Sequence, residues 1–376
     1  MNTGAACLHG ITGLALLRRI ACYHVVTMTR RGFVSGVALA AGTVDPLQQA
    51  SPHSLIKPPA LRDGDAVALI TPATDVSDPG ELAAASAALK YLGLKPKLGQ
   101  NVGKRLGYLG GTIDERLDDL HAAFRDPDVR AIFCIRGGYG SAQLLDRIDY
   151  GLIRSNPKIF VGFSDITALH LAIRKETNLV TFHGPVVLFH GSAAHFNEFT
   201  LRSFRKALFD KSAIGPLNNP VPENPLSNAH PTRAIKRGTA QGRLIGGNLT
   251  LICSLMGTPY EIDTREAILF TEDVGEPPYR VDRMLTQLRL AGKLAAAAAM
   301  VFGECASCGP GDYMPEFSST LSLGEVLDQI VGRLNVPSFT GLLIGHTDYQ
   351  LTLPLGVLAT MDADKGEIVI EEPAVS

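Results

Sequence analysis

The chain has 376 residues, of which 45% are hydrophobic and 19% are charged, and this composition excludes a disordered or mainly polar protein. The length suits two domains better than one. The 35 Lys and Arg residues nearly balance the 37 Asp and Glu residues, and the resulting net charge of −2 disfavours a dedicated nucleic-acid binder.

The first 40 residues are interpreted as an N-terminal extension that carries an export signal. Arg30-Arg31 is followed by Phe33 and by an uncharged, mildly apolar stretch over 32–44, which is typical of a twin-arginine signal, and residues 38–40 offer an Ala-Leu-Ala cleavage site. The expected location is the periplasm, and the alternative is a disordered arm on a cytoplasmic protein. No later run reaches the roughly 18 apolar residues of a membrane-spanning helix, so no integral membrane segment is expected.

Residues 61–190 alternate short apolar strands with helices. Each predicted strand is a continuous apolar run that is separated from the next by a segment with helical spacing. The predicted strands are 66–70, 131–135, 159–163 and 180–182, and the predicted helices are 82–92, 117–124 and 166–175. Such strands are typical of a parallel sheet that helices cover on both faces, so an N-terminal α/β domain is expected.

The rest of the chain predicts a linker and a second domain. Several Pro and Asn residues and little apolar periodicity mark 215–237, and residues 191–241 are interpreted as the linker. Residues 242–372 return to a mixed pattern and are expected to form a C-terminal mixed α/β domain. Its predicted elements are strands 268–271 and 299–302, helices 281–290 and 323–334, and a closing hairpin of 357–361 with 367–370.

Ser164 directly follows an apolar strand and directly precedes a helix. Such a tight turn would lift the hydroxyl out of the sheet, and the first N–H groups of the helix could stabilise an oxyanion. The segment Gly162-Phe-Ser-Asp-Ile166 meets only half of the G-x-S-x-G nucleophile elbow, because Ile166 stands where the second glycine would be. The alternative role is the common one of a serine that caps a helix N-terminus.

A serine nucleophile needs a base and an acid that orients the base, and several residues compete for these roles. His346 follows one apolar run and Glu272 ends another, so both would lie at strand ends. His183 ends a third run, and spacing alone does not choose between His183 and His346. Gly137-Gly-Tyr-Gly140 also ends a strand; it could present N–H groups to an anion or be a plain turn. Further candidate bases are His170, His190 and His195.

The sequence does not support a metal or cofactor site. It contains no H-E-x-x-H pattern, and Cys305-Ala-Ser-Cys308 is a lone C-x-x-C without the second ligand pair that a zinc site needs. Two buried thiols are expected there, and a disulfide formed after export is the alternative. Cys134 and Cys253 lie in apolar runs and are expected in the core.

Six sequence blocks together resemble the LD-carboxypeptidase family, the serine peptidases that include murein tetrapeptide carboxypeptidases and the microcin C self-immunity proteins. They occur in the family's order and run from about residue 66 to about residue 370. The blocks are Arg136-Gly-Gly-Tyr-Gly140, Gly162-Phe-Ser-Asp165, Thr181-Phe-His-Gly-Pro185, Gly242-Arg-Leu-Ile-Gly-Gly-Asn248, Leu269-Phe-Thr-Glu-Asp273 and Ile344-Gly-His346. Each block alone is weak, whereas the set is specific.

This resemblance implies a fold and a set of site residues. The N-terminal domain would be a Rossmann-like or flavodoxin-like parallel sheet, and the active site would lie between it and the C-terminal domain. The residues that match the family's Ser–Glu–His triad are Ser164, Glu272 and His346. The backbone N–H groups of Gly138 and Asp165 would form the oxyanion hole, and Asn248 would lie on the substrate side. Family members are commonly homodimers, so a homodimer is expected.

The resemblance also implies a reaction. A carboxypeptidase of this family removes the terminal D-alanine of a murein tetrapeptide by cleaving the L,D bond after meso-diaminopimelate or Lys, in peptidoglycan turnover and recycling. The expected partner is therefore a muropeptide. Cations that could hold its terminal carboxylate are Arg136, Arg280 and Arg283.

Two other functions stay open at this point. An immunity-type relative would hydrolyse a peptidyl or aminoacyl sulfamoyl-adenylate, but such relatives stack the nucleobase on aromatic residues, notably a Trp, and this chain has no Trp. A non-catalytic periplasmic binding protein would also have two domains and an export signal. The Ser, Glu and His residues in matching blocks argue against that third function.

Overall fold

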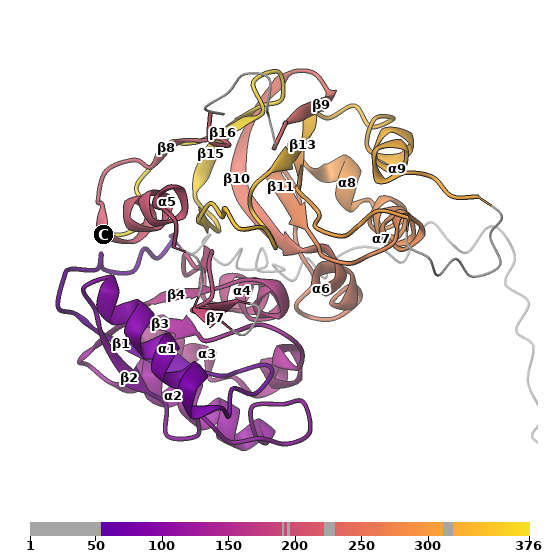
Figure 1. The fold of residues 1–376 in the computed structure, drawn as a ribbon. Helices are drawn as coiled ribbons and strands as arrows, with labels where there is room; N and C mark the ends of the chain where they lie inside the picture. The colour runs from indigo at the N-terminus through magenta and orange to yellow at the C-terminus, as the bar shows by residue number, and fades with distance from the viewer. Residues whose placement is uncertain (1–53, 190–191, 194–195, 222–229, 311–318) are drawn as a thin grey trace, which may run out of the picture. The chain divides into compact units, whose positions relative to one another are not determined.

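The computed structural model describes residues 54–189, 192–193, 196–221, 230–310 and 319–376. The predicted export signal, residues 1–40, lies outside the described residues. The described part contains two large sheets, and Figure 1 shows the first mainly in indigo and magenta and the second mainly in orange and yellow. No helix in these ranges is long and apolar enough to cross a membrane.

The first sheet is parallel except at one edge. Its strands lie in the order β14-β5-β4-β3-β1-β2, and β14 pairs antiparallel with β5. The strands are β1 (Ala66–Ile70), β2 (Lys95–Leu98), β3 (Val129–Cys134), β4 (Ile159–Gly162), β5 (Phe182–His183) and β14 (Leu353–Pro354). This is the flavodoxin-like order expected for the N-terminal domain. The sequence did not predict β2, because this edge strand reads Lys-Pro-Lys-Leu and is largely exposed.

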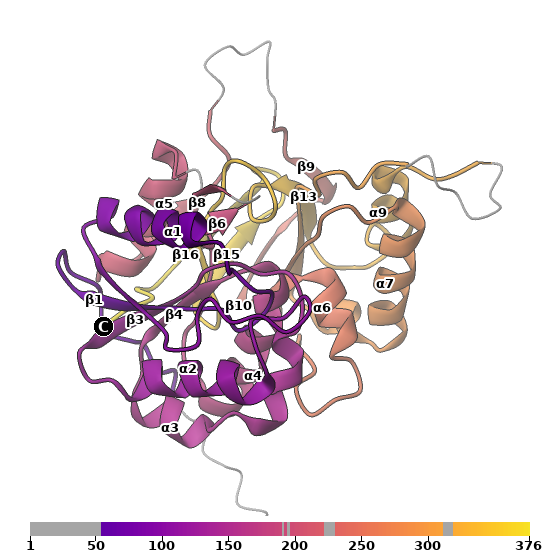
Figure 2. The same ribbon diagram turned by 60° about the horizontal axis from the view of Figure 1, so that its bottom comes forward.

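Helices cover both faces of this sheet, as the continuous apolar strands predicted. Along β1, Leu69 packs in the core that contains Leu89 of α1, whereas Ile70 packs in the core that contains Phe124 of α2. Figure 2 shows α1 on one side of β3 and β4, with α2, α3 and α4 on the other. The helices are α1 (Pro79–Tyr91), α2 (Ile113–Arg125), α3 (Tyr150–Ser155) and α4 (Thr167–Thr177), with the short 3₁₀ helices η1 (Ser141–Arg147) and η2 (Ser164–Ile166).

The second sheet is mixed and has the strand order β8-β16-β15-β10-β11-β12-β13-β9. Its centre, β10 to β13, is parallel, and antiparallel strands flank it. The strands are β8 (Gly215–Leu217), β9 (Arg233–Lys236), β10 (Thr239–Asn248), β11 (Ala267–Glu272), β12 (Ala299–Gly303), β13 (Ser338–Leu342), β15 (Leu358–Asp362) and β16 (Glu367–Ile370). The last two confirm the predicted closing hairpin. The remaining elements are α6 (Leu249–Ser254), α7 (Pro278–Leu290), α8 (Lys293–Ala296), α9 (Leu323–Ile330), and the small pair β6 (Leu188–Phe189) and β7 (Ser192–Ala193).

Residues 191–241, interpreted as a linker, contribute folded elements to the structure. Helix α5 (Glu198–Phe209) begins after the capping residue Asn197 and packs Phe204 against Phe133 of β3. Strands β8 and β9 from the same segment form the two edges of the second sheet. The interpretation as a linker rested on the Pro and Asn residues of 215–237 and did not predict α5, whose buried face includes the polar residues Thr200 and Ser203.

Cys305 and Cys308 form a disulfide bond, so the expectation of two buried thiols was wrong. The intervening turn, in which Ser307 has a φ of 56°, brings the two Cα atoms to 5.5 Å, a separation that a disulfide spans. Cys134 and Cys253 are buried free thiols, as expected.

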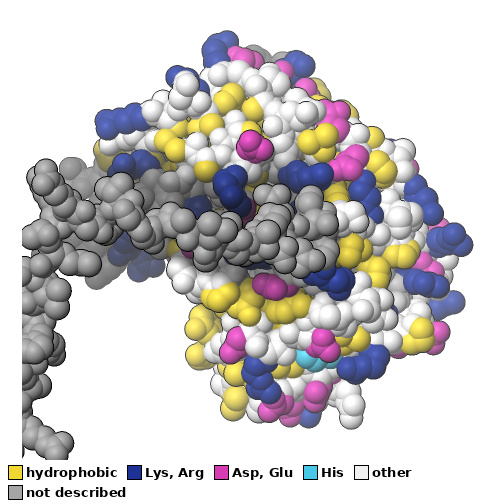
Figure 3. Space-filling model, turned by 180° about the vertical axis from the view of Figure 1, so that it is seen from behind, with side chains coloured by type: hydrophobic (Ala, Val, Ile, Leu, Met, Phe, Trp, Pro, Cys, Tyr) yellow, Lys and Arg dark blue, Asp and Glu magenta, His cyan; other side chains and the backbone are white. Residues whose placement is uncertain are grey.

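The surface carries charges of both signs. On the face that Figure 3 shows, Lys and Arg side chains are interspersed with Asp and Glu side chains, as the nearly balanced composition predicts. Exposed ion pairs such as Arg233–Asp328, at 2.8 Å, stabilise the fold by at most about 1 kcal/mol each.

Candidate active site

Ser164 lies at the carboxyl end of β4 in a left-handed backbone conformation, with a φ of 63°. A non-glycine residue pays about 1–2 kcal/mol for this conformation, which is the strain typical of a nucleophile elbow. The turn is also tightly packed. A Cβ on Gly162 would lie 2.8 Å from the Ile166 side chain, and a Cβ on Gly137 would lie 3.3 Å from the Ser164 Oγ. The first glycine of the elbow is therefore required, although Ile166 replaces the second.

Ser164 does not cap a helix, so the alternative role considered from the sequence was wrong. The N-cap residues of η2 and α4 are Phe163 and Ile166, and neither helix has a side-chain cap hydrogen bond. Helix capping therefore does not explain why a strained serine stands at this position.

The glycine loop after β3 lies against the serine turn. Gly138 has a φ of 109°, and any Cβ there would lie 2.1 Å from the Thr74 Oγ1. Thr74 fixes the loop through two hydrogen bonds: its Oγ1 accepts from the Tyr139 N–H at 3.0 Å, and its N–H donates to the Gly137 carbonyl at 3.4 Å. Gly138 is exposed, and no hydrogen bond among the described residues uses its N–H. The loop thus holds a backbone donor near Ser164.

Two buried charged residues connect this loop to the serine turn. The Asp165 carboxylate accepts from the Ser141 N–H at 2.8 Å, and the Ser141 Oγ donates to the Asp165 carbonyl at 2.6 Å. The Arg116 guanidinium donates to the Gly140 carbonyl at 2.9 Å and to the Pro72 carbonyl at 3.0 Å. Burial raises the pKa of Asp165, while the Ser141 hydrogen bonds and the Arg116 charge oppose that rise. Sequence reasoning missed Arg116, because an arginine in a helix is usually exposed.

Glu272 and His346 form a hydrogen-bonded pair. Glu272 ends β11 with its side chain fully buried, and its Oε2 lies 2.8 Å from the His346 Nδ1. This close approach requires Gly345, where a Cβ would lie 2.4 Å from the same Oε2. An Nδ1–H donated to a carboxylate leaves the imidazole lone pair on Nε2, which is the tautomer that a general base needs.

The Glu272–His346 pair lies near the residue that precedes Ser164. The His346 ring lies 4.7 Å, between centroids, from the ring of Phe163, the residue before Ser164. Thr167, the first residue of α4, accepts a hydrogen bond from the Asn248 N–H at 2.9 Å, and Asn248 is the register partner of Glu272. The ring contact between Phe163 and His346 therefore links the turn after β4 to the end of β11, where Glu272 pairs with His346.

Asn248, predicted on the substrate side, is only 3% exposed and uses its side chain inside the protein. Its Nδ2 donates to the Asp273 Oδ1 at 3.0 Å, and its Oδ1 accepts from the Leu251 N–H at 3.1 Å, which caps α6. Asp273 also accepts from the Thr250 N–H and hydroxyl. Burial and the neighbouring Glu272 charge raise the pKa of Asp273. These contacts make Asn248 a positioning residue for the end of β11.

The other candidate histidines occupy different places. His183 is fully buried, with its Nε2 2.7 Å from the Ile344 carbonyl, so it supports the backbone that carries His346. Burial lowers its pKa, which keeps the ring neutral and makes Nε2–H the donor. His170 lies 2.8 Å from the Gly162 carbonyl, and burial lowers its pKa to about 3. His190 and His195 lie outside the described residues.

The three candidate arginines differ in their surroundings. Arg136 is half-buried and immediately precedes Gly137, which contacts Ser164. Arg280 and Arg283 are exposed on α7, and Arg280 forms an ion pair with Glu276 at 3.6 Å. Of the three, Arg136 is therefore the one that immediately precedes a residue packed against the serine turn.

Comparison with known proteins identifies the family of this chain. Residues 67–184 match the LD-carboxypeptidase N-terminal domain, and residues 241–361 match the LD-carboxypeptidase C-terminal domain. A Bacillus subtilis protein named "Probable murein peptide carboxypeptidase" is 41% identical over 321 residues, which cover 84% of this chain and 94% of the relative. The chain belongs to the LD-carboxypeptidase family.

Solved structures of the family have the same fold. A microcin C7 self-immunity protein in complex with aspartyl sulfamoyl adenosine is 29% identical, with a TM-score of 0.76 over 85% of this chain and 100% of that one. A muramoyltetrapeptide carboxypeptidase from Oxalobacter formigenes is 30% identical, with a TM-score of 0.69 over 82% and 99% of the two chains. Solved structures with this fold therefore include both a carboxypeptidase and a self-immunity protein, the two kinds of relative that the sequence analysis named.

Proposed function

We propose that this protein is a serine LD-carboxypeptidase that removes the terminal D-alanine from a murein tetrapeptide, in peptidoglycan turnover. The observation that carries the proposal is the pairing of His346 with the buried Glu272, beside the strained Ser164 turn. The relatives named as murein and muramoyltetrapeptide carboxypeptidases support the substrate class.

The proposed mechanism assigns one role to each part of the site. Glu272 holds the Nδ1–H of His346, so that Nε2 takes the proton from Ser164 as its Oγ attacks the carbonyl of the third stem residue. The N–H groups of Gly138 and Asp165 hold the oxyanion that forms. His346 then gives its proton to the nitrogen of the leaving D-alanine, and a water molecule releases the acyl group by the same sequence in reverse.

The Gly138 N–H is expected to be sensitive to substitution. Gly138→Ala should lower kcat by at least about 100-fold, because the new Cβ overlaps the Thr74 Oγ1 and turns the N–H away from the oxyanion. Gly107→Ala is the matched control, since Gly107 also has a positive φ but has nothing within 4 Å of an added Cβ. Steady-state kinetics on the tetrapeptide check this, and equal losses in both variants would contradict the assignment.

Arg136 is the proposed partner of the substrate's terminal carboxylate, because it precedes the glycine loop that contacts Ser164. Arg136→Gln should raise KM by about 10- to 100-fold while changing kcat less, since a charge-assisted hydrogen bond is lost. A tetrapeptide with an amidated C-terminus has no carboxylate for Arg136 to bind, so the variant and the wild type should have the same KM for it. Arg283→Gln, on the exposed side of α7, is the control. If Arg136→Gln raises KM equally for the free and the amidated tetrapeptide, this role is contradicted.

Hydrolysis of an aminoacyl sulfamoyl-adenylate is the alternative, supported by the structural likeness to the self-immunity protein. The absence of Trp from the chain argues against stacking of a nucleobase. Assaying both substrates side by side separates the two functions, and we expect the tetrapeptide to give the higher kcat/KM. Export by a twin-arginine signal and homodimerisation stay predictions of the sequence.

A further inference from the structure

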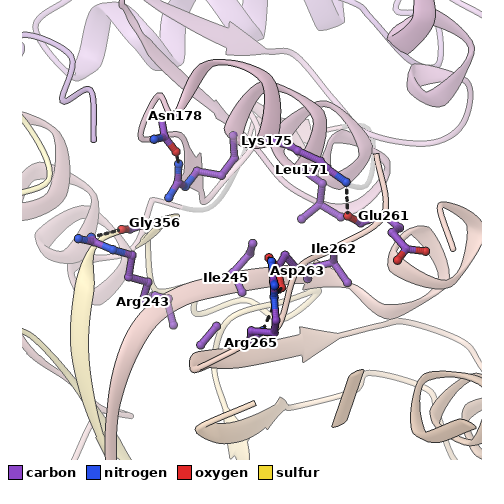
Figure 4. Close-up of a pocket in the computed structure, with 13 residues that line it drawn as sticks. Leu171, Lys175, Asn178, Arg243, Ile245, Glu261, Ile262, Asp263, Arg265 and Gly356 are labelled. Atoms are coloured by element: carbon purple, nitrogen blue, oxygen red, sulfur yellow. Dashed lines mark hydrogen bonds and ion pairs between the residues drawn. The ribbon is translucent and has the colours of Figure 1, made fainter. Parts of the chain in front are cut away.

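A pocket lies beside the C-terminal half of α4, the half that is farther from Ser164. It has a volume of about 330 Å³ and lies between the last turn of α4, the middle of β10, the segment 261–267 and Gly356 (Figure 4). Helix α4 spans Thr167–Thr177, so its rise of about 1.5 Å per residue places Arg174, which lines the pocket, about 10 Å along the helix from Thr167. The pocket is therefore separate from the candidate active site.

Basic side chains outnumber acidic ones in the pocket lining. The cations are Arg174, Lys175, Arg243 and Arg265, and the acids are Glu261 and Asp263. Both acids are already paired: Asp263 accepts from Arg265 at 2.9 Å, and Glu261 accepts from Lys293 at 2.8 Å. The lining thus has an excess of positive charge on the side of Arg174 and Arg243.

Arg174 is the least satisfied of these cations. Its guanidinium donates to the Asn178 side chain, but its Nε is buried and has no hydrogen-bond partner in the described structure. Gly356 makes room for it, because a Cβ there would lie 2.3 Å from this Nε. Burial and the nearby charge of Arg243 lower the pKa of Arg174 to about 10. A buried cation without an anionic partner is costly unless a ligand supplies one.

Arg243 approaches the same glycine from β10. It donates to the Gly356 carbonyl at 2.8 Å, and its closest carboxylate is Glu372, at 3.5 Å. That carboxylate is shared, since it also pairs with Lys57 at 2.6 Å and accepts from the Leu358 N–H at 2.7 Å. One carboxylate therefore faces two cations, and Arg243 keeps part of its charge uncompensated.

We propose that this pocket binds a small oxyanion, a phosphate or a carboxylate group, between the guanidinium groups of Arg174 and Arg243. Guanidinium groups bind both kinds of anion through paired hydrogen bonds, and an anion at this point would neutralise two cations that otherwise repel each other. Apolar neighbours, Leu171, Ile245 and Ile262, line the same pocket and suit the carbon part of an organic phosphate or acid. This inference does not depend on the peptidase activity.

Calorimetric titration of the full chain tests the inference in two arms. One arm uses inorganic phosphate and the other uses acetate, each in buffer matched with chloride for ionic strength. We expect saturable binding in at least one arm, and the tighter arm identifies the chemistry of the natural ligand. Binding in neither arm overturns the proposal.

Substitutions locate the binding. Arg243→Gln should weaken it by at least about tenfold, because one charge-assisted pair of hydrogen bonds is lost, and Arg174→Gln gives an independent second variant. Arg265→Gln is the matched control, since this arginine lines the same pocket but is committed to Asp263. Thermal unfolding verifies that each variant is folded. Unchanged affinity in folded Arg243→Gln and Arg174→Gln overturns the proposal, as does an equal loss in Arg265→Gln.

Discussion

Replacing Ser164 by alanine is expected to reduce kcat for tetrapeptide cleavage by about 10⁴- to 10⁶-fold, because the nucleophile itself is removed. The fold should survive, since alanine and serine bear the same strain at a φ of 63°. Mass-spectrometric kinetics measure the loss, and thermal unfolding measures stability. Ser254→Ala is the control, because that serine is exposed on α6 and its hydroxyl only donates to the Thr250 carbonyl.

Ser164→Gly sharpens the same test. Glycine adopts positive φ without strain, so this variant should be about 1 kcal/mol more stable than the wild type and equally inactive. Greater stability with lost activity is what a residue held under strain for catalysis would give. Retention of wild-type activity in either variant would rule out Ser164 as the nucleophile.

Replacing Glu272 by glutamine is expected to lower kcat by about 10³- to 10⁴-fold with little change in KM. The amide keeps the size of the buried side chain but removes the charge that stabilises the His346 imidazolium, and it no longer enforces the Nδ1–H tautomer. Steady-state kinetics and thermal unfolding check the prediction together. Glu371→Gln, at an exposed position, is the control.

A Glu272→Gln enzyme with nearly normal kcat would show that His346 works without its acid. A variant that fails to fold would be resolved with Glu272→Asp, which keeps the charge but shortens the reach to the Nδ1. The proposed role then predicts a folded enzyme whose kcat lies between those of the wild type and an inactive protein.

The sequence predicted the sheet that carries Ser164 because burial on both faces leaves a clear pattern. Strands β1 and β4 and residues 131–134 of β3 are continuous apolar runs, and a turn follows each of them. Edge strand β2 has no such pattern, since Lys95 and Lys97 face solvent. Helix α5 was missed because its buried face includes Thr200 and Ser203, which read as polar in sequence. Local hydrophobic pattern thus predicts the elements whose buried residues are apolar. It misses the elements that are exposed or whose buried residues include polar ones.

The site residues show a different limit of sequence reasoning. His183 and His346 both follow apolar runs, so spacing does not separate them; the family resemblance selects His346, and in the structure His346 is the one that lies 2.8 Å from the Glu272 Oε2. The sequence gives no sign that Arg116 is a buried structural residue, because its hydrogen-bond partners are the carbonyl groups of Pro72 and Gly140 in distant loops. The disulfide likewise depends on the turn geometry at Ser307, which spacing does not encode.

The most direct test of the central proposal is mass spectrometry of murein tetrapeptide incubated with the full chain. We predict the loss of one alanine residue, with the D-alanine released, at a rate that EDTA does not change and that Ser164→Ala abolishes. A tetrapeptide that stays intact with the wild-type protein, or one that is trimmed equally by Ser164→Ala, would contradict the proposal.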